Sequence, residues 1–408
     1  MKMKDYTRCI PEGLRDVQDE EALIKQKIEH KVRQLFTQYN YCFLETPTFE
    51  YLDVFTLGNQ SYQSKDLYTW INREGEIVAL RSDQTRAIAR VVATSYSTLA
   101  YPKRYAYLSS TFRCLKQYQG KMHEFTQAGV ELMGVTNTQS DAEIIVLAIE
   151  ALKLCGIKDF TIHLASATFL HEVLEALDLT KEMKEGIEQA IKIKDAVSVR
   201  KILQTWEGEE ALAELLIDLL QSSGSLALLE ALKVKIKHPT ILKALDYLEN
   251  LYTRLTYFGV ADYILFDFSI LSYASYYTGM MFQAYTEGVG TAIVEGGRYD
   301  TLLQNFGIDV PAVGMAMNIN LILQKYRQEE KEIKREACFL VGWESPLVQK
   351  GIKLAEELRS QGYRVECALS NDYTRELNYA KKTGIDKFIF LENESIHRMD
   401  KEEMGWSL

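Results

Sequence analysis

The chain has 408 residues, of which 47% are hydrophobic and 25% are charged, and its net charge at neutral pH is −10. This length and composition are ordinary for a soluble globular protein of two or three domains, with ample material for buried cores. The negative charge gives no bulk attraction to nucleic acid, so a nucleic-acid site would need a local basic patch.

Cysteine, histidine and glycine spacings indicate neither a metal site nor a cofactor. The six cysteines are scattered without a C-x-x-C pair, so we expect reduced thiols in a cytoplasmic protein. The histidines lack the spacing of a metal site, and Gly288-Val289-Gly290 does not continue as a dinucleotide loop. The first eleven residues carry no apolar export segment, and no run approaches the ~18 apolar residues of a membrane span.

The first half of the chain predicts a long helix, a β-hairpin and a second helix. Apolar residues recur on one face of the first helix at Ile24, Ile28, Val32, Leu35 and Phe36. Strand-like runs at residues 105–113 and 125–134 flank a polar loop at residues 116–123, which is typical of an antiparallel hairpin. Residues 140–143 form a capping box that predicts the start of the second helix.

The second half predicts an insertion, a linker and a further domain. Residues 170–257 are rich in Leu, Ala, Glu and Lys, which indicates a helical insertion within a domain spanning residues 1–324. Strands resume at residue 263 and continue to Gly314. The charged run at residues 325–336 is typical of a solvated helix end followed by a linker. Alternating strand and helix patterns over residues 337–408 predict a small α/β domain with a parallel or mixed sheet.

Several motifs, in order, resemble those of histidyl-tRNA synthetases. Residues 271–279 (LSYASYYTG) resemble the histidine-recognition motif R-G-L-D-Y-Y-T-G, and residues 311–321 resemble motif 3. Further matches are Pro11 to Asp16, residues 44–49 (motif 1), residues 79–85, Phe112-Arg113 (motif 2), residues 127–134 and the G-G-R-Y-D run at residues 296–300. The resemblance implies an α+β fold with the antiparallel sheet of class II synthetases, flanking helices, the helical insertion and a small, truncated anticodon-binding-like α/β domain.

The chemistry-bearing positions of these motifs are altered. Ser272 and Leu321 stand where the synthetase family places arginines on the carboxylate and on ATP, and Leu115 replaces the motif 2 glutamate. Ser275 replaces the recognition-motif aspartate, and His123 stands at another arginine position. Adenylate formation joins two negative groups and needs preorganised cations, and loss of one such donor costs ~10²–10³ in rate. The resemblance therefore implies a chain without catalytic residues.

The positions that would bind histidine itself are retained. By resemblance, Asp83, Thr85 and Gln127 would hold an α-ammonium group, Glu131 and Tyr277 would meet the imidazole, and Arg113 would neutralise the carboxylate. Tyr276 adjoins this pocket. Each residue also has a structural alternative: Thr85 as a helix cap, Gln127 and Glu131 as a hydrogen-bond network on one strand face, and the two tyrosines as packing aromatics.

A synthetase-like chain without catalytic cations resembles the regulatory subunits of bacterial ATP phosphoribosyltransferase. That resemblance implies a dimer, a short-form catalytic ATP phosphoribosyltransferase subunit as partner, and feedback inhibition by histidine. Histidine would bind in the synthetase-like pocket or at a subunit junction. We do not expect membrane binding, and the C-terminal domain carries more Asp and Glu than Lys and Arg, which argues against tRNA binding. The alternatives are a divergent histidyl-tRNA synthetase and a paralogue that senses uncharged tRNA.

Overall fold

A computed structural model describes most of the chain, namely residues 6–58, 66–95, 100–114, 122–193, 195–206, 208, 210–219, 223–270, 277–329, 337–393, 395–400 and 403. It divides into two compact units, Met1–Lys331 and Glu332–Leu408. None of the helices in the described ranges has the length and apolar character needed to cross a membrane.

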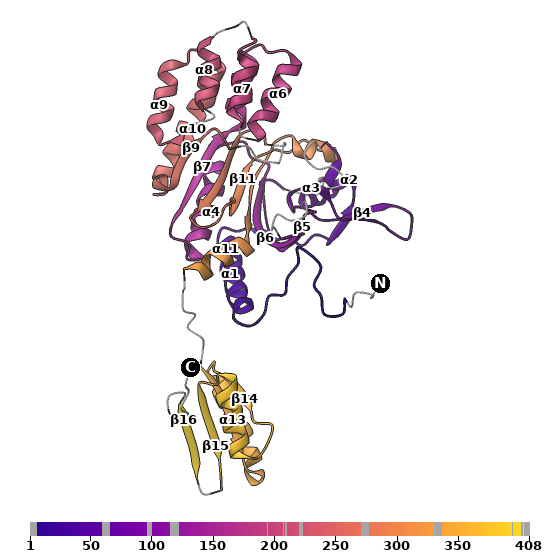
Figure 1. The fold of residues 1–408 in the computed structure, drawn as a ribbon, viewed down its shortest axis with the longest axis vertical. Coiled ribbons are helices and arrows are strands. Elements are labelled where there is room, and N and C mark those ends of the chain that lie inside the picture. The colour runs from indigo at the N-terminus through magenta and orange to yellow at the C-terminus, as the bar shows by residue number, and fades with distance from the viewer. Residues whose placement is uncertain are drawn as a thin grey trace. The chain divides into compact units, whose positions relative to one another are not determined.

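The first unit is built on a nine-stranded mixed sheet with the order β1-β5-β6-β12-β11-β10-β7-β9-β8 (Figure 1). β1 pairs with β5 and β7 with β9 in parallel, and the remaining neighbours are antiparallel. The sheet is therefore mainly antiparallel, as expected, but two of its strand pairs are parallel. Along the chain the strands are β1 (Cys42–Phe43), β5 (Lys103–Phe112), β6 (Glu124–Met133), β7 (Phe160–Ser166), β8 (Ser223–Gly224), β9 (Ile264–Asp267), β10 (Met280–Thr286), β11 (Val294–Arg298) and β12 (Ala312–Asn318).

One face of this sheet is covered by α1 (Asp19–Gln38), α4 (Thr138–Leu154) and α11 (Ile319–Gln328). The apolar stripe predicted for the first helix is confirmed, because the buried residues of α1 are those five residues. The predicted hairpin is also confirmed, since β5 and β6 pair antiparallel over ten residues each. The predicted capping box at residues 140–143 is wrong. The N-cap of α4 is Asn137, whose side chain accepts a hydrogen bond from the Ser140 N–H.

On the other side of the sheet, α3 (Thr85–Thr94) and η4 (Leu302–Phe306) pack in one apolar cluster with the rings of Tyr107 and Tyr299. A separate three-stranded sheet precedes α3 in the chain, with the order β2-β4-β3. Its strands are β2 (Phe49–Tyr51), β3 (Thr69–Ile71) and β4 (Ile77–Leu80), and the short helix α2 (Asp53–Thr56) follows β2.

Helices dominate the segment between β7 and β9, where the composition predicted an insertion (Figure 1). They are α5 (Ala167–Ala176), α6 (Lys181–Lys192), α7 (Ala196–Leu203), α8 (Glu210–Leu219), α9 (Leu226–Lys235) and α10 (Pro239–Tyr257), and the single turn η3 (Ala261–Tyr263) leads into β9. α10 packs on α4, α5 and α9, so the segment rests directly on the sheet-covering layer. Its two-residue strand β8 also forms the outermost strand of the large sheet.

The second unit contains a four-stranded sheet with the order β14-β13-β15-β16. Alternate residues of β13 pack against α12 on one face and α13 on the other, which gives two small cores. The elements are β13 (Cys338–Trp343), η5 (Ser345–Leu347), α12 (Val348–Ser360), β14 (Arg364–Cys367), α13 (Tyr373–Thr383), β15 (Lys387–Leu391) and β16 (Ile396–Asp400). β16, antiparallel to β15, is a strand that was not expected from the sequence.

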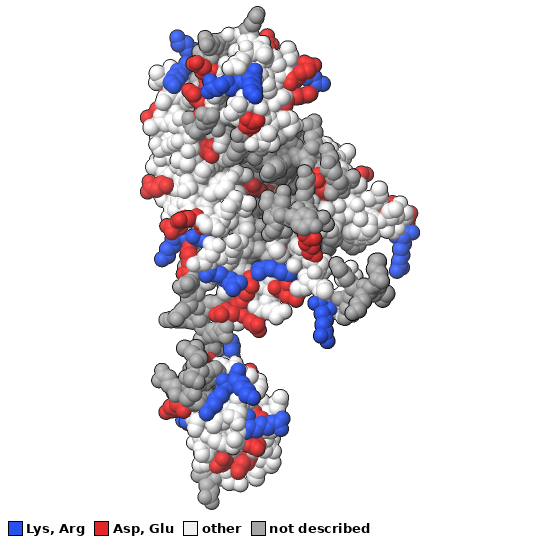
Figure 2. All heavy atoms as spheres, viewed as in Figure 1, with Lys and Arg blue, Asp and Glu red and all other residues white. Residues whose placement is uncertain are grey.

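Charged side chains of both signs are mixed on the described part of one face of the protein. On the face in view in Figure 2, the described Lys and Arg side chains of each unit are interspersed with Asp and Glu. Mixed signs of this kind are typical of a solvated surface rather than of a nucleic-acid interface.

Candidate ligand-binding site

The candidate pocket is built on one face of β6. Residues of a strand point alternately to its two faces, so Gln127, Gly129 and Glu131 share a face. In the neighbouring strands, Glu131 lies opposite Gly314 of β12, and Gly129 lies opposite Tyr107 of β5. On this face, which is opposite to the face covered by α4, the neighbouring strands β5, β6 and β12 therefore carry polar and small residues.

Two glycines make room for the polar side chains. A Cβ atom at residue 314 would overlap Oε2 of Glu131, and one at residue 129 would overlap the Tyr107 hydroxyl. Any larger residue at either position would therefore displace a pocket side chain. Close approach explains these glycines, because neither has a positive φ angle.

Glu131 lies at the centre of the site and is only 1% exposed. Its Oε1 accepts a hydrogen bond from Thr85 Oγ1 at 2.7 Å, and its Oε2 accepts one from the Tyr299 hydroxyl. Thr85 is the first residue of α3, and Tyr299 directly follows β11, so donors from two distant segments fix this carboxyl group. The alternative role of Thr85 as a helix cap is wrong, since Gln84 occupies the N-cap and the Thr85 hydroxyl donates to Glu131.

Burial raises the pKa of Glu131 to about 8, although the hydrogen bonds from Tyr299 and Thr85 oppose the shift. The negative charge of Asp83 raises this pKa further. The free protein therefore holds the Glu131 carboxyl group largely protonated at neutral pH. A cationic group brought beside it would stabilise the carboxylate and release the proton.

We expect Glu131→Gln to stabilise the free protein increasingly as the pH rises. An unfolded glutamate titrates near pH ~4.3, whereas folded Glu131 keeps its proton up to a pKa of about 8. Within that window the folded state binds more protons, so the wild-type free energy of unfolding falls by up to ~1.4 kcal/mol for each step of one in pH. Glutamine has no such titration, so the stability difference should grow through the window and level off above it.

Urea denaturation of both proteins at about pH 5, 7 and 9 would measure that difference. Glu124→Gln is the control, because it makes the same substitution at a partly exposed position at the start of the same strand. A stability difference between Glu131→Gln and wild type that stays constant with pH would contradict the raised pKa.

Asp83 and Gln127 provide acceptors beside Glu131. Asp83 is buried, and its side chain accepts a hydrogen bond from the Arg86 N–H at 3.1 Å. Its negative charge contributes to the raised pKa of both Tyr107 and Glu131. Gln127 is only 5% exposed, and its Oε1 has no donor among the described residues. Because an unmet buried acceptor costs about 1–3 kcal/mol, this oxygen is suited to a ligand N–H. A carboxylate and an amide oxygen together suit an ammonium group.

Arg113 and Tyr277 lie at the margins of the pocket. Arg113 follows β5, its Nε donates to the Ser82 carbonyl at 3.5 Å, and its guanidinium lies 5.1 Å from the centre of the Phe125 ring. The Tyr277 ring packs on Gly297 and on the apolar cluster around Tyr107, so its packing role is real. Burial chiefly raises the pKa of Tyr107, and nearby Tyr277 contributes to the same shift, so the two tyrosines lie close together.

Several residues singled out in the sequence lie outside the described part of the chain, namely Leu115, Ser272, Ser275 and Tyr276. Leu321 is described: it is half-buried in the first turn of α11, where its N–H is accepted by Asn318 Oδ1 at 3.2 Å. His123, at another altered arginine position, contacts the Tyr68 hydroxyl.

Tyr299 and Tyr107 are pocket residues that were not expected from the sequence. Tyr299 belongs to the G-G-R-Y-D motif that was recognised, and the alternation of an extended chain places it on the face opposite Arg298. That Tyr299 reaches Glu131 follows only from the strand order β6-β12-β11, which the sequence does not reveal.

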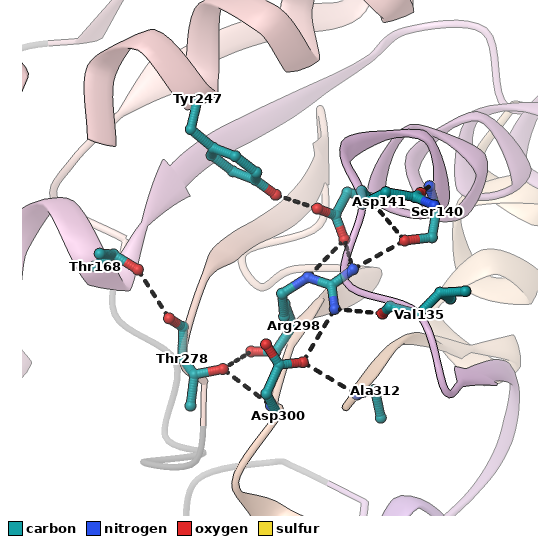
Figure 3. A network of polar contacts seen from close by, with 10 residues as sticks. Val135, Ser140, Asp141, Thr168, Tyr247, Thr278, Arg298, Asp300 and Ala312 are labelled. Carbon is teal, nitrogen blue, oxygen red and sulfur yellow. Dashed lines mark hydrogen bonds and ion pairs between the residues drawn. The ribbon is translucent and has the colours of Figure 1, made fainter. Parts of the chain in front are cut away.

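A buried polar network lies on the opposite face of β11 (Figure 3). Arg298 donates to Asp141 Oδ1 of α4 from Nε at 3.0 Å and from Nη2 at 2.5 Å, and to the Val135 carbonyl at 2.9 Å. Tyr247 of α10 donates to the second oxygen of Asp141. Burial alone would lower the pKa of Arg298, but the charge and hydrogen bonds of Asp141 outweigh it and raise that pKa.

Comparison with known proteins identifies the family to which this site belongs. The histidyl-tRNA synthetase family model matches residues 13–322. The chain is 31% identical over 402 residues to the ATP phosphoribosyltransferase regulatory subunit of Clostridium botulinum strain Langeland, covering 98% of this chain and 95% of that one. It is 35% identical over 358 residues to the subunit of the same name from Thermoanaerobacter pseudethanolicus, covering 88% and 93%.

Solved structures agree with this result. A Bacillus halodurans protein, described as an ATP phosphoribosyltransferase regulatory subunit/histidyl-tRNA synthetase, superposes with a TM-score of 0.83 at 28% identity, over 95% of this chain and 99% of that one. Histidyl-tRNA synthetase from Nostoc sp. PCC 7120 superposes with a TM-score of 0.79 at 19% identity, over 97% of each chain, which shows a shared fold. With 31% identity along 98% of its length, the chain belongs to the family of ATP phosphoribosyltransferase regulatory subunits, built on the histidyl-tRNA synthetase fold.

Proposed function

We propose that this protein is the non-catalytic regulatory subunit of an ATP phosphoribosyltransferase, and that histidine bound in the Glu131 pocket inhibits the complex. The names of the relatives, each an ATP phosphoribosyltransferase regulatory subunit, support the regulatory role. One observation carries the proposal of histidine as ligand: the pocket retains its buried acceptors Glu131, Asp83 and Gln127, while the sequence replaces the cations that ATP would need.

Histidine matches these groups one by one. An imidazole N–H would donate to Glu131, and the Tyr277 hydroxyl would meet the other ring nitrogen. The α-ammonium group would donate hydrogen bonds to the Asp83 carboxylate and to Gln127 Oε1, which has no donor among the described residues. Thr85, which already donates to Glu131, can still accept one ammonium hydrogen. Arg113, at the rim, would neutralise the carboxylate.

Catalysis of adenylate formation does not fit the same site. The reaction brings a carboxylate against the α-phosphate of ATP, and preorganised cations must stabilise the charge that develops. Leu321 and Ser272 offer no cation, and Leu115 offers no carboxylate for a metal ion or a base. Two missing donors at ~10²–10³ each would leave too little activity for translation.

We expect the purified protein to show no histidine-dependent exchange of pyrophosphate into ATP and no charging of tRNA with histidine. In the same preparation it should co-elute with a short-form catalytic subunit and raise its phosphoribosyltransferase rate, and histidine should reduce that rate. A functional histidyl-tRNA synthetase serves as the positive control for exchange. Exchange above background would favour a divergent synthetase, and absence of co-elution or activation would contradict the regulatory role.

We also propose that the chain forms a dimer through the three-stranded sheet that follows the motif 1 segment. Phe49, Tyr51 and Trp70 share one face of this sheet, and they are 50%, 55% and 41% exposed. The rings of Phe49 and Trp70 lie 5.2 Å apart, so these side chains form one continuous apolar surface. Exposed apolar surfaces of this kind are typical of interaction sites.

Tyr51→Glu is expected to shift the protein from dimer to monomer at micromolar concentration, because a charge would be buried without a partner in the interface. Light scattering across a dilution series would measure the shift. Tyr257→Glu makes the same change at an 83% exposed tyrosine at the end of α10 and should leave the dimer intact. A wild-type monomer, or equal effects of both variants, would contradict this interface.

A further inference from the structure

Two pairs of consecutive residues connect the pocket with helices that do not line it. Arg298 and Tyr299 form one pair, and Tyr277 and Thr278 form the other. In each pair one residue has its side chain in the pocket, and its neighbour is hydrogen-bonded to a helix: Arg298 to Asp141 of α4, and Thr278 to Thr168 of α5. A movement of either anchored residue would therefore move a pocket tyrosine.

The first connection runs from α10 to Glu131. The Tyr247 hydroxyl donates to Asp141, and Asp141 accepts hydrogen bonds from two nitrogens of Arg298 (Figure 3). Tyr299, the next residue, donates to Glu131. Asp141 is fully buried, and Arg298 is 5% exposed. A buried charge pair in which every acceptor is occupied has one favoured arrangement, because any shift leaves a charge unsatisfied.

The second connection runs from α5 to Tyr277. Thr168 Oγ1 donates to the Thr278 carbonyl at 2.8 Å, and the Ala167 N–H donates to the Gly279 carbonyl at 2.8 Å. Thr278 is tied in turn to the first connection: its N–H donates to the Arg298 carbonyl at 2.7 Å, and its hydroxyl accepts the Asp300 N–H at 2.9 Å (Figure 3). The two connections therefore meet between residues 298 and 300.

We propose that Tyr247 and Thr168, on the helices between β7 and β9, are positioning residues for the ligand pocket, and that these helices set its affinity by holding Tyr299 and Tyr277 in place. Neither side chain touches the pocket itself. The naming of histidine as the ligand rests on the proposed function, whereas the positioning of the two tyrosines does not. A partner or ligand that moved α5 or α10 would alter the pocket through these same bonds.

Tyr247→Phe removes one hydroxyl and little volume, so it tests the first connection. We expect histidine binding to weaken by about 2- to 12-fold, the factor that corresponds to one hydrogen bond of ordinary net strength. In the free protein, amide hydrogen exchange in residues 294–300 should be faster than in wild type. Thr168→Val should act in the same direction on residues 277–280, with a smaller effect because Thr168 is exposed.

Tyr252→Phe is the matched control. Tyr252 lies on the same helix, its ring packs 5.7 Å from that of Phe266, and no hydrogen bond of its hydroxyl occurs among the described residues. It should change neither affinity nor exchange. A double-mutant cycle with Tyr299→Phe then separates positioning from general stability: if Tyr247 acts through Tyr299, the second substitution should add little to the loss of affinity.

The outcomes are distinct. Faster exchange at residues 294–300 with weaker, non-additive histidine binding supports the proposal. A lower melting temperature with unchanged exchange and affinity overturns it, since Tyr247 would then only stabilise the fold. If wild-type protein binds no histidine, the proposed function fails, and the exchange measurement alone decides the positioning: faster exchange in Tyr247→Phe supports it, and unchanged exchange overturns it.

Discussion

Glu131→Ala is expected to weaken histidine binding by about 10- to 150-fold, since a hydrogen bond to a charged group contributes about 1.5–3 kcal/mol. The carboxyl group is buried and is held by Thr85 and Tyr299, so its geometry exists before the ligand arrives. The side chain points into the sheet face and not toward the three-stranded sheet, so assembly should survive. Titration calorimetry on the isolated chain and inhibition assays on the complex measure the effect.

Glu124→Ala, at the start of the same strand, is the control and should bind histidine normally. Asp83→Asn should also weaken binding, because the α-ammonium would lose its charged partner. Unchanged histidine inhibition in both Glu131→Ala and Asp83→Asn would place the sensing site elsewhere, at the junction with the catalytic subunit.

Arg298→Met should lower the free energy of unfolding by about 3–5 kcal/mol, the usual cost of breaking a buried ion pair from one side. The substitution leaves the fully buried Asp141 with the Tyr247 hydroxyl and without a cation. It also removes the donors to Val135, Ser140 and Asp300. Urea denaturation monitored by circular dichroism would give the value for the first unit.

Two comparisons make that result specific. Lys25→Met breaks the partly exposed pair with Glu29 and should cost at most about 1 kcal/mol. The double variant Arg298→Met with Asp141→Leu removes both buried charges, and it should be more stable than Arg298→Met alone. A loss below ~1 kcal/mol in the single variant, similar to the surface pair, would contradict the view that Asp141 is a buried charge that depends on Arg298.

Local patterns in the sequence predicted the elements well where one face is apolar. The stripe from Ile24 to Phe36 specifies α1, because residues at helical spacing share the side that meets the sheet. The strand pair around the polar loop at residues 116–123 was also predicted from a local pattern, because two strand-like runs flank a polar segment. The start of α4 was predicted incorrectly, because Asn137 and Ser140 can both cap a helix. Only the backbone conformation shows that Asn137 is the cap.

Contacts between segments that are distant in the sequence could not be predicted from local patterns. Tyr299 and Glu131 are 168 residues apart, and Arg298 and Asp141 are 157 residues apart. Their pairing depends on which strands become neighbours, and a strand order is a property of the whole sheet. The family resemblance predicts Glu131 as a ligand residue, and that role also stays a prediction. The resemblance did not indicate that two hydroxyl groups already hold the carboxyl group. The roles of Asp83, Gln127, Arg113 and Tyr277 toward a ligand stay predictions.

The strand β8 has a consequence for engineering this protein. Because Ser223 and Gly224 pair with β9, the helical segment also completes the edge of the large sheet, and α10 supplies the tyrosine on Asp141. The segment is therefore not a detachable module. A shortened chain without residues 170–257 would leave β9 as an unpaired edge, which favours aggregation, and would remove a partner from a buried carboxylate. A minimal version of the protein should retain β8 and α10 and be shortened only among α6, α7 and α8.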